Sequence, residues 1–212
     1  SKGDKVRCET SFPLDEQSPL RTLDGKPITQ GLRTGAFAES VVVDASQLAP
    51  IPKDIPLDSA SILSCGVITG FGAVVNTAQI TSGSSVVVIG TGGVGLNSVQ
   101  GAAIAGAEKI IALDLSDTKL EASKKFGATH TVNVELENER ELVKGLTGGR
   151  GADYVFVTVG AKSALEQGFK LLCKGGTLVI VGMTADGVQI EFDSCAFASV
   201  EQRLLGSKMG ST

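Results

Sequence analysis

The sequence predicts an α/β fold in which helices flank a doubly wound parallel sheet. From about residue 84 onward, short apolar runs of strand length alternate with segments that have helical character. The run SSVVVIG at 84–90 is almost continuously apolar, as expected of a strand that is covered on both faces. The composition agrees, because 27 glycines and only 4% aromatic residues suit tight turns and close helix–strand packing.

The expected elements follow one another in a regular order. The helix at 117–126 has the clearest ends, because Ser116 can cap it and Gly127 can stop it. Right-handed crossovers between parallel strands then give the doubly wound sheet. Strands are expected at 84–90, 109–114, 129–133, 153–160 and 176–182, and helices at 93–105, 117–126, 137–146 and 161–172.

The first 52 residues have a different character. They hold most of the six prolines and short β-type runs such as FAESVVVD at 37–44, and they lack helical periodicity. These features predict strands and loops of a β-rich domain. Between 56 and 78 the sequence predicts one or two helices, which begin near Asp58 or Ser59 and are interrupted by glycines.

Charge and cysteine usage exclude several classes of protein. The formal net charge is −4 with both signs spread along the chain, so the basic surface expected of a nucleic-acid-binding protein is missing. No uninterrupted apolar run approaches the ~18 to 20 residues of a membrane-spanning helix, and the N-terminus lacks the apolar segment of a signal peptide. The four cysteines form no C-x-x-C pair. We therefore expect a cytoplasmic protein that binds neither nucleic acid nor a membrane.

A glycine-rich loop carries the strongest local signal. VVVIGTGGVG places Gly90, Gly92 and Gly95 in the pattern G-x-G-x-x-G, between a predicted strand and a predicted helix. In a Rossmann fold the first glycine makes the tight turn, the second lets the backbone approach a pyrophosphate, and the third lets the helix pack on the strand. A turn that binds nothing is the alternative, because glycine-rich turns are common in such a chain. A P-loop is excluded because G-K-[ST] is missing.

Asp114 strengthens the prediction that this loop binds a dinucleotide. It ends the next predicted strand, 19 residues after Gly95. A carboxylate at this position can accept hydrogen bonds from both hydroxyls of the adenosine ribose and would repel a 2′-phosphate, which favours NAD over NADP. In the alternative interpretation, Asp114 caps a helix or is a solvated strand end.

With these residues in hand, the chain resembles the medium-chain zinc-dependent alcohol dehydrogenases, above all their class III-like and bacterial NAD-dependent members. The resemblance extends over nearly the whole chain in the family's order and spacing. It implies a remnant of a GroES-like catalytic domain at 1–60, a Rossmann NAD-binding domain at 61–208, and a return to the catalytic domain at 209–212. The segments that carry it are KGDKV, FAESVVVD, LSCGVITGFGAVVNTAQI, GSSVVVIGTGGVGLNSVQGAAIAGAEKIIALDLS, FGATHTVN, GRGADYVFVTVG and GGTLVIVGM.

The resemblance implies roles for individual residues. Cys65 would be one of three protein ligands of a catalytic zinc, and Thr69 would touch the nicotinamide; the two would share a face of an α-helix. Asp114 would bind the ribose, with Lys119 beside the adenosine. The implied cofactor-binding residues are Thr69, Gly90, Gly92, Gly93, Val94, Gly95, Asp114, Lys119, Thr158, Val159, Val181 and Met183.

The implied reaction is the NAD-dependent oxidation of a small alcohol to an aldehyde or ketone. NAD would carry the hydride, and a zinc with one open position would lower the pKa of the bound alcohol. The family commonly pairs into dimers or tetramers through an edge strand, for which QIEFDS at 189–194 and LLGSK at 204–208 are the candidates.

The sequence also departs from the family's pattern. A G-H-E segment, which supplies further zinc ligands and part of the proton relay, is missing, and residues 8–35 hold Cys8 where the family has four clustered cysteines. We therefore expect a partial chain that provides mainly the cofactor domain and has little or no turnover by itself. His130 is expected at a strand start, remote from Cys65. Cys173 and Cys195 are expected to be small core residues.

Two other functions stay open at this stage. One is a zinc-free quinone or enone reductase of the same superfamily, in which Cys65 would be a buried thiol near the cofactor cleft. Such enzymes usually favour NADP and would not be expected to carry both Asp114 and Cys65. The other is a non-catalytic module that binds NAD through the glycine loop and Asp114.

Overall fold

The computed structural model describes residues 18–30 and 34–210, and the chain divides into two compact units, Ser1–Ala60 and Ser61–Thr212. We describe each unit by itself. Cys8 and the KGDKV segment lie outside the described residues.

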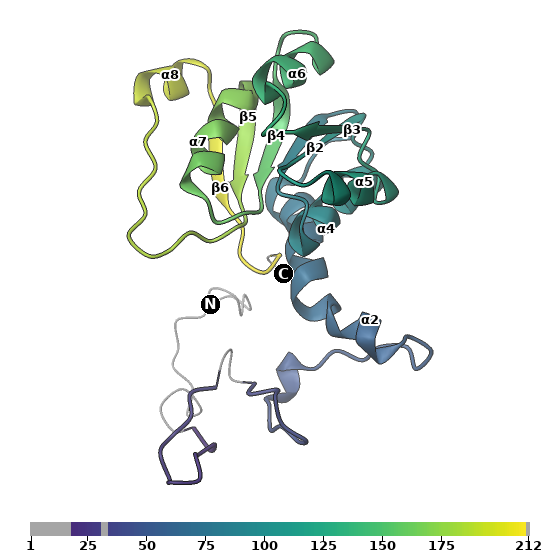
Figure 1. Cartoon of the computed structure of the whole chain (residues 1–212), viewed down its shortest axis with the longest axis vertical. Coiled ribbons are helices and arrows are strands. Elements are labelled where there is room, and N and C mark those ends of the chain that lie inside the picture. The colour runs from purple at the N-terminus through teal and green to yellow at the C-terminus, as the bar shows by residue number, and fades with distance from the viewer. Residues whose placement is uncertain (1–17, 31–33, 211–212) are drawn as a thin grey trace. The chain divides into compact units, whose positions relative to one another are not determined.

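The second unit is built on a six-stranded parallel sheet with the strand order β3-β2-β1-β4-β5-β6 (Figure 1). Its strand order reverses between β1 and β4, which makes the carboxyl ends of these strands a topological switch point. This architecture confirms the predicted doubly wound α/β fold. The strands are β1 Ser85–Ile89, β2 Lys109–Asp114, β3 His130–Asn133, β4 Ala152–Val157, β5 Leu172–Ile180 and β6 Arg203–Gly206.

Helices cover both faces of the sheet. On one face α6 and α7 contribute Val143 and Leu165 to a buried cluster, and on the other α4 and α5 contribute Val99 and Leu120. Strand β1 serves both clusters, because its residues alternate between the two faces and all five are buried. The helices are α4 Gly93–Ile104, α5 Asp117–Lys125, α6 Glu139–Leu146, α7 Lys162–Leu171 and α8 Ser194–Ser199.

One helical run, Leu57–Ala78, leads into this unit. It consists of α2 Leu57–Ser61, a π-helical turn Leu63–Val67, α3 Ile68–Gly72 and a second π-helical turn Ala73–Ala78. The expectation that glycines would interrupt the run was wrong. A Cβ at Gly70 would overlap the Val94 carbonyl oxygen, and one at Gly72 would overlap that of Gly210. These glycines therefore allow close backbone packing rather than ending the helix.

The same run is 22 residues long with a mean hydropathy of 1.5, so by length and composition alone it could cross a membrane. The expectation that no segment reaches this length was wrong, because it rested on uninterrupted apolar runs, whereas this run is apolar on average with polar residues interspersed. A helix in a protein core passes the same test, but only 22% of the apolar window is buried, and that part includes Ala73 and Val74 in the core cluster of α4 and α5.

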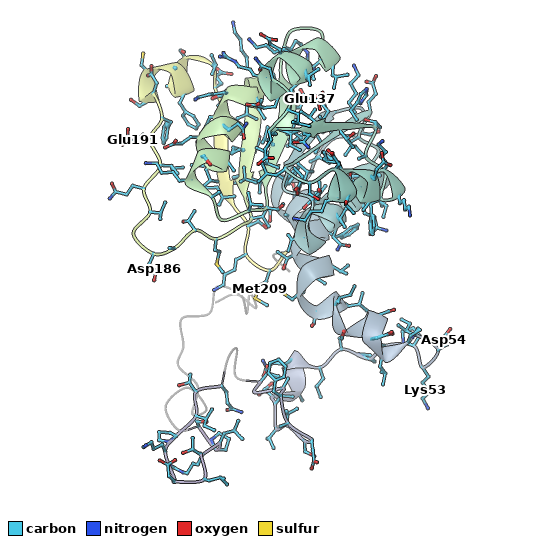
Figure 2. The ribbon with its side chains drawn as sticks, in the orientation of Figure 1. Lys53, Asp54, Glu137, Asp186, Glu191 and Met209 are labelled. Atoms are coloured by element: carbon cyan, nitrogen blue, oxygen red, sulfur yellow. The ribbon has the colours of Figure 1, made fainter. Side chains whose placement is uncertain are left out.

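The chain leaves β5 through a long loop that carries Asp186 and Glu191 and leads to α8 (Figure 2). After β6 it passes Met209, and the Asn76 side chain donates a hydrogen bond of 2.9 Å to the Gly210 carbonyl oxygen. The end of the described chain is therefore held against the second π-helical turn.

The first unit contains little regular structure within its described residues. A turn at 22–26 is closed by an antiparallel bridge between Arg21 and Pro27, and a short 3-10 helix spans Ala45–Gln47. The prediction of a strand in FAESVVVD was wrong, because residues 37–44 form bends and irregular backbone. A β-type run becomes a strand only when another strand pairs with it, and Phe37 and Val42 remain exposed here.

Candidate functional site

The carboxyl ends of β1, β2 and β4 are joined by backbone hydrogen bonds. Gly90 N donates to the Leu113 carbonyl oxygen over 2.7 Å, and Thr158 N donates to that of Ile89 over 3.0 Å. The Thr158 hydroxyl adds a bond of 2.7 Å to the Gly90 carbonyl oxygen. The glycine loop therefore leaves β1 in a position fixed by both neighbouring strands.

Two of the motif glycines are required by this geometry. Gly90 has a φ of +89°, which L-residues rarely adopt, and a Cβ there would overlap Val159. A Cβ at Gly95 would overlap the Gly90 carbonyl oxygen and lie 2.9 Å from the Thr158 hydroxyl. The first glycine thus makes the turn, and the third lets α4 approach the end of β1.

The middle of the loop is open. A Cβ at Gly92 or Gly93 would meet no atom within 4 Å in the described chain. Helix α4 begins at Gly93, and no side chain caps it. The first N–H groups of a helix have no partner within that helix and carry the positive end of its dipole. The start of α4 can therefore receive an anionic group such as a pyrophosphate.

Asp114 lies at the end of β2 and is bound to this loop. Its Oδ2 accepts hydrogen bonds from Thr91 N at 2.7 Å and from the Thr91 hydroxyl at 3.1 Å, and its Oδ1 accepts one from Ser116 N at 3.0 Å. Burial alone would raise the pKa of the Asp114 carboxyl, but these hydrogen bonds outweigh it and hold the pKa below its usual value. Asp114 is thus a carboxylate at neutral pH.

Lys119 and Thr91 complete the surroundings of this carboxylate. The Lys119 ammonium lies 3.8 Å from Asp114 Oδ1, with 56% of its side chain exposed. Thr91 is almost fully buried. A carboxylate has about four lone-pair sites, and Thr91 and Ser116 occupy three of them. The sequence did not single out Thr91, since only the fold brings its hydroxyl to β2.

The residues expected around the nicotinamide follow β4 and β5. Thr158 and Val159 come directly after β4, and Val181 is buried directly after β5. Met183 is exposed in the loop after β5. Gly160 and Gly182 allow these two loops to pack backbone to backbone, because a Cβ at Gly160 would overlap the carbonyl oxygen of Met183. The fold therefore brings these four positions to the same edge as the glycine loop.

Thr69 has a buried hydroxyl without a hydrogen-bond partner in the described part of the chain. It precedes Gly70, the residue that packs against Val94 in the first turn of α4. Leaving a buried hydroxyl unpaired costs about 1–3 kcal/mol, so such an atom commonly marks a place where a ligand or water binds. The orphaned oxygen fits a cofactor group beside the start of α4.

Cys65 is exposed and lies in the π-helical turn before α3, so the α-helical spacing expected between Cys65 and Thr69 does not apply there. Residues 18–30 and 34–210 hold no group of three His, Cys, Asp or Glu side chains that could bind a metal ion. A catalytic zinc needs about three protein ligands. The described residues therefore do not fit a catalytic zinc by themselves.

The other candidate ligands lie elsewhere. His130 begins β3, where its Nδ1 shares a hydrogen bond of 2.9 Å with the Thr129 hydroxyl. Cys173 is buried as expected, and burial together with the Asp153 carboxylate raises its pKa. The expectation of a buried Cys195 was wrong, because α8 is a short helix that leaves Cys195 exposed.

Comparisons with known proteins agree with this geometry. A family model described as zinc-binding dehydrogenase matches residues 93–212. The chain belongs to this family. Alcohol dehydrogenase-like 7 of Arabidopsis thaliana is 36% identical over 98% of this chain and 58% of the relative. Alcohol dehydrogenase class-3 of Oryza sativa subsp. japonica is 38% identical over 88% of this chain and 50% of the relative.

Solved structures of zinc-binding dehydrogenases have the same fold. An alcohol dehydrogenase zinc-binding domain protein from Burkholderia ambifaria superposes with a TM-score of 0.88 at 32% identity, covering 95% of this chain and 54% of that one. A putative zinc-binding dehydrogenase from Sinorhizobium meliloti 1021, bound to NADP, gives 0.65 at 30% identity over 68% of this chain and 43% of that one. The resemblance to medium-chain zinc-type alcohol dehydrogenases is thus confirmed, and the chain spans about half the length of the curated relatives it matches.

Proposed function

We propose that this chain supplies the NAD-binding part of an alcohol dehydrogenase, which oxidises a small alcohol to an aldehyde or ketone. One observation carries the proposal: the Asp114 carboxylate is bound to the same loop whose open glycines and uncapped helix can receive a pyrophosphate. The remaining lone pair of Oδ1 is the place for a ribose hydroxyl. NAD, when bound, accepts the hydride.

The preference for NAD or NADP distinguishes this proposal from the zinc-free reductase. A 2′-phosphate at the end of β2 would face the Asp114 carboxylate, although Lys119 lies on the same side. Fluorescence titration of the purified chain should give NADH a dissociation constant at least about tenfold lower than that of NADPH. Tighter binding of NADPH would favour the zinc-free reductase and contradict the proposal.

We further propose that Cys65 contributes one ligand to a zinc in the complete enzyme. Cys65 is exposed on the helical run that leads to Thr69, while the described residues supply no second and third ligand near it. Elemental analysis of this chain should find zinc far below one per chain, and alcohol oxidation with NAD should be close to background. Stoichiometric zinc together with robust turnover would show that this chain forms the site alone.

The enzyme is proposed to act in the cytoplasm as a homodimer or tetramer, away from nucleic acid and membranes. Of the two candidate segments, LLGSK at 204–208 overlaps the edge strand β6, where Leu204 is exposed, whereas QIEFDS at 189–194 is irregular backbone and the start of α8. We therefore propose β6 as the edge for pairing. Light scattering of the purified chain tests it, and a monomer at all concentrations would contradict the dimer.

A further inference from the structure

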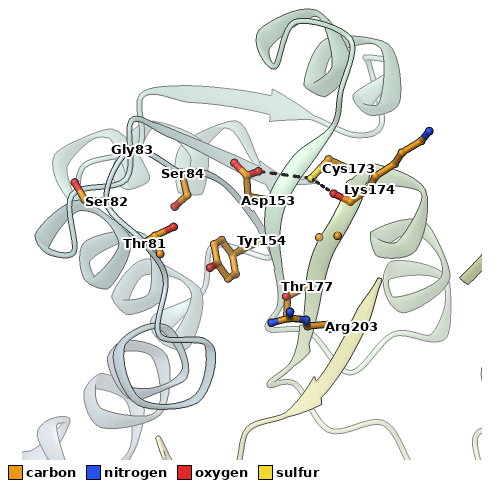
Figure 3. A pocket seen from close by; sticks show the side chains of 12 residues that line it. Thr81, Ser82, Gly83, Ser84, Asp153, Tyr154, Cys173, Lys174, Thr177 and Arg203 are labelled. Atoms are coloured by element: carbon orange, nitrogen blue, oxygen red, sulfur yellow. Dashed lines mark hydrogen bonds between the residues drawn. The ribbon is translucent and has the colours of Figure 1, made fainter. Parts of the chain in front are cut away.

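A concave site lies at the opposite edge of the sheet from the glycine loop. A cavity of about 350 Å³ opens between the loop 81–84, which precedes β1, and residues in the first halves of strands β4, β5 and β6 (Figure 3). Its lining includes the polar or charged residues Thr81, Ser82, Ser84, Asp153, Tyr154, Lys174, Thr177 and Arg203.

Strand register explains why polar groups gather here. Tyr154 of β4 pairs with Thr177 of β5, and Thr177 pairs with Arg203 of β6. Residues in register on neighbouring parallel strands point to the same face of a sheet. Two residues further along, the corresponding row is Phe156, Val179 and Leu205, which belongs to the apolar core cluster under α4 and α5. Along β4, β5 and β6 this face is therefore polar in the first row and apolar in the next.

One buried hydrogen-bonding group of the cavity has no partner in the described protein. Ser84 is only 6% exposed, yet its hydroxyl has no partner within the described residues. Figure 3 shows Ser84 on the same side of the cavity as Thr81 and Tyr154, with Thr177 and Arg203 side by side below. Arg203 forms no ion pair with a described carboxylate, in contrast to Arg150, which lies 3.6 Å from Asp153.

The charge of the cavity is positive, because two cationic residues, Arg203 and Lys174, line it. Asp153 also lines it, but its Oδ2 accepts hydrogen bonds from Ser85 N and the Ser85 hydroxyl at 2.8 and 2.7 Å, and its Oδ1 faces Arg150. The Cys173 thiol donates to that same oxygen over 3.6 Å. The Asp153 carboxylate is thus compensated, whereas the Arg203 guanidinium is not.

We propose that this cavity binds a small oxyanion, a phosphate, sulfate or carboxylate group, through the Arg203 guanidinium and the hydroxyls of Tyr154 and Thr177. A guanidinium presents paired N–H donors that match the oxygens of such anions. The hydroxyls supply further donors, and the Ser84 oxygen gains a partner when its side chain turns toward the ligand. This site is separate from the glycine loop and does not depend on the proposed dehydrogenase function.

Titration of the isotope-labelled full chain with inorganic phosphate, followed by amide chemical shifts, tests the proposal. We expect saturable shifts of the amides of Ser84, Tyr154 and Thr177. Arg203→Gln should weaken phosphate binding at these amides by about tenfold or more, because a charge-assisted interaction is lost. Lys170→Gln is the matched control, since it removes one positive charge from an exposed position on α7 and should leave the affinity unchanged.

Two further measurements make the outcome decisive. Thr177→Val keeps the charge and should weaken binding a few-fold. Parallel titrations with sulfate and with acetate at constant ionic strength distinguish a site for tetrahedral anions from one for carboxylates. Phosphate shifts that are confined to the amides of Gly92, Gly93 and Val94, or equal affinity in wild type and Arg203→Gln, would overturn the proposal.

Discussion

The two edges of the sheet contain the same local motif in different surroundings. At the carboxyl edge Asp114 accepts hydrogen bonds from the N–H and hydroxyl of Thr91, and at the amino edge Asp153 accepts them from the N–H and hydroxyl of Ser85. Each carboxylate thereby holds one end of β1. Each carboxylate also has a cation nearby, Lys119 at Asp114 and Arg150 at Asp153, but only Asp114 lies beside the uncapped start of α4.

An aspartate at a strand end is therefore not by itself a sign of cofactor binding. Both aspartates stabilise the sheet by the same hydrogen bonds. The difference lies in the backbone beside them, because only the Asp114 edge has the first N–H groups of a helix without a capping side chain. The predictions that follow separate the part of each edge that stabilises the fold from the part that binds.

The largest effect, a loss of unfolding free energy, is expected from Gly95→Ala. Its Cβ would overlap the Gly90 carbonyl oxygen, so α4 must move away from β1. Overpacking of this kind costs about 3 kcal/mol of unfolding free energy, which urea denaturation measures. Gly93→Ala is the control in the same helix, where the new methyl group meets open space and stability should change by less than about 0.5 kcal/mol. Equal stability of the two variants would show that the carboxyl edge does not depend on close packing.

Gly92→Ala should separate binding from stability at the same edge. Gly92 has a φ of −72°, which alanine adopts without strain, and a Cβ there meets no described atom. The folded protein should therefore be as stable as the wild type. The methyl group would stand where a pyrophosphate must approach, so NADH affinity should fall by about tenfold or more in a fluorescence titration. Unchanged affinity would place the cofactor elsewhere.

The two aspartates provide the most direct comparison. Asp114→Asn should weaken NADH binding about fivefold, roughly the net value of one hydrogen bond, and should reduce the preference for NADH over NADPH. Asp153→Asn should leave both affinities unchanged while it lowers the unfolding free energy by about 1–2 kcal/mol. If both substitutions changed NADH affinity equally, the assignment of the ribose to the carboxyl edge would be wrong.

Much of this arrangement could be predicted from the sequence, for identifiable reasons. Alternating apolar strands and helices gave the parallel sheet, and the spacing of Gly90, Gly92 and Gly95 placed the turn. FAESVVVD resembled a strand, but pairing depends on a partner that no local pattern specifies. The Thr91–Asp114 bonds and the row Tyr154, Thr177 and Arg203 depend on register between distant segments. Tertiary structure creates such contacts, and local spacing does not reveal them.

The smallest effect concerns acid stability, to which both edges should contribute. Hydrogen bonds outweigh burial at Asp114 and at Asp153 and lower the pKa of each carboxyl below its ordinary value of 3.8. A carboxyl whose pKa is lower in the folded state stabilises the fold above its unfolded pKa, and this stabilisation is lost as the pH falls through the folded pKa. Each contribution is expected to be about 1 kcal/mol or less, because both groups are partly solvated.

Urea denaturation between pH 6 and pH 2.5 measures this contribution. Wild-type stability should decrease as the pH falls below about 4, and Asp114→Asn or Asp153→Asn should each make that decrease shallower. Asp186→Asn is the control, because Asp186 lies exposed in the loop between β5 and α8. A pH dependence that stays as steep in both variants as in the wild type would mean that neither carboxylate is held by its hydrogen bonds in solution, and the similarity between the two edges would then be limited to their geometry.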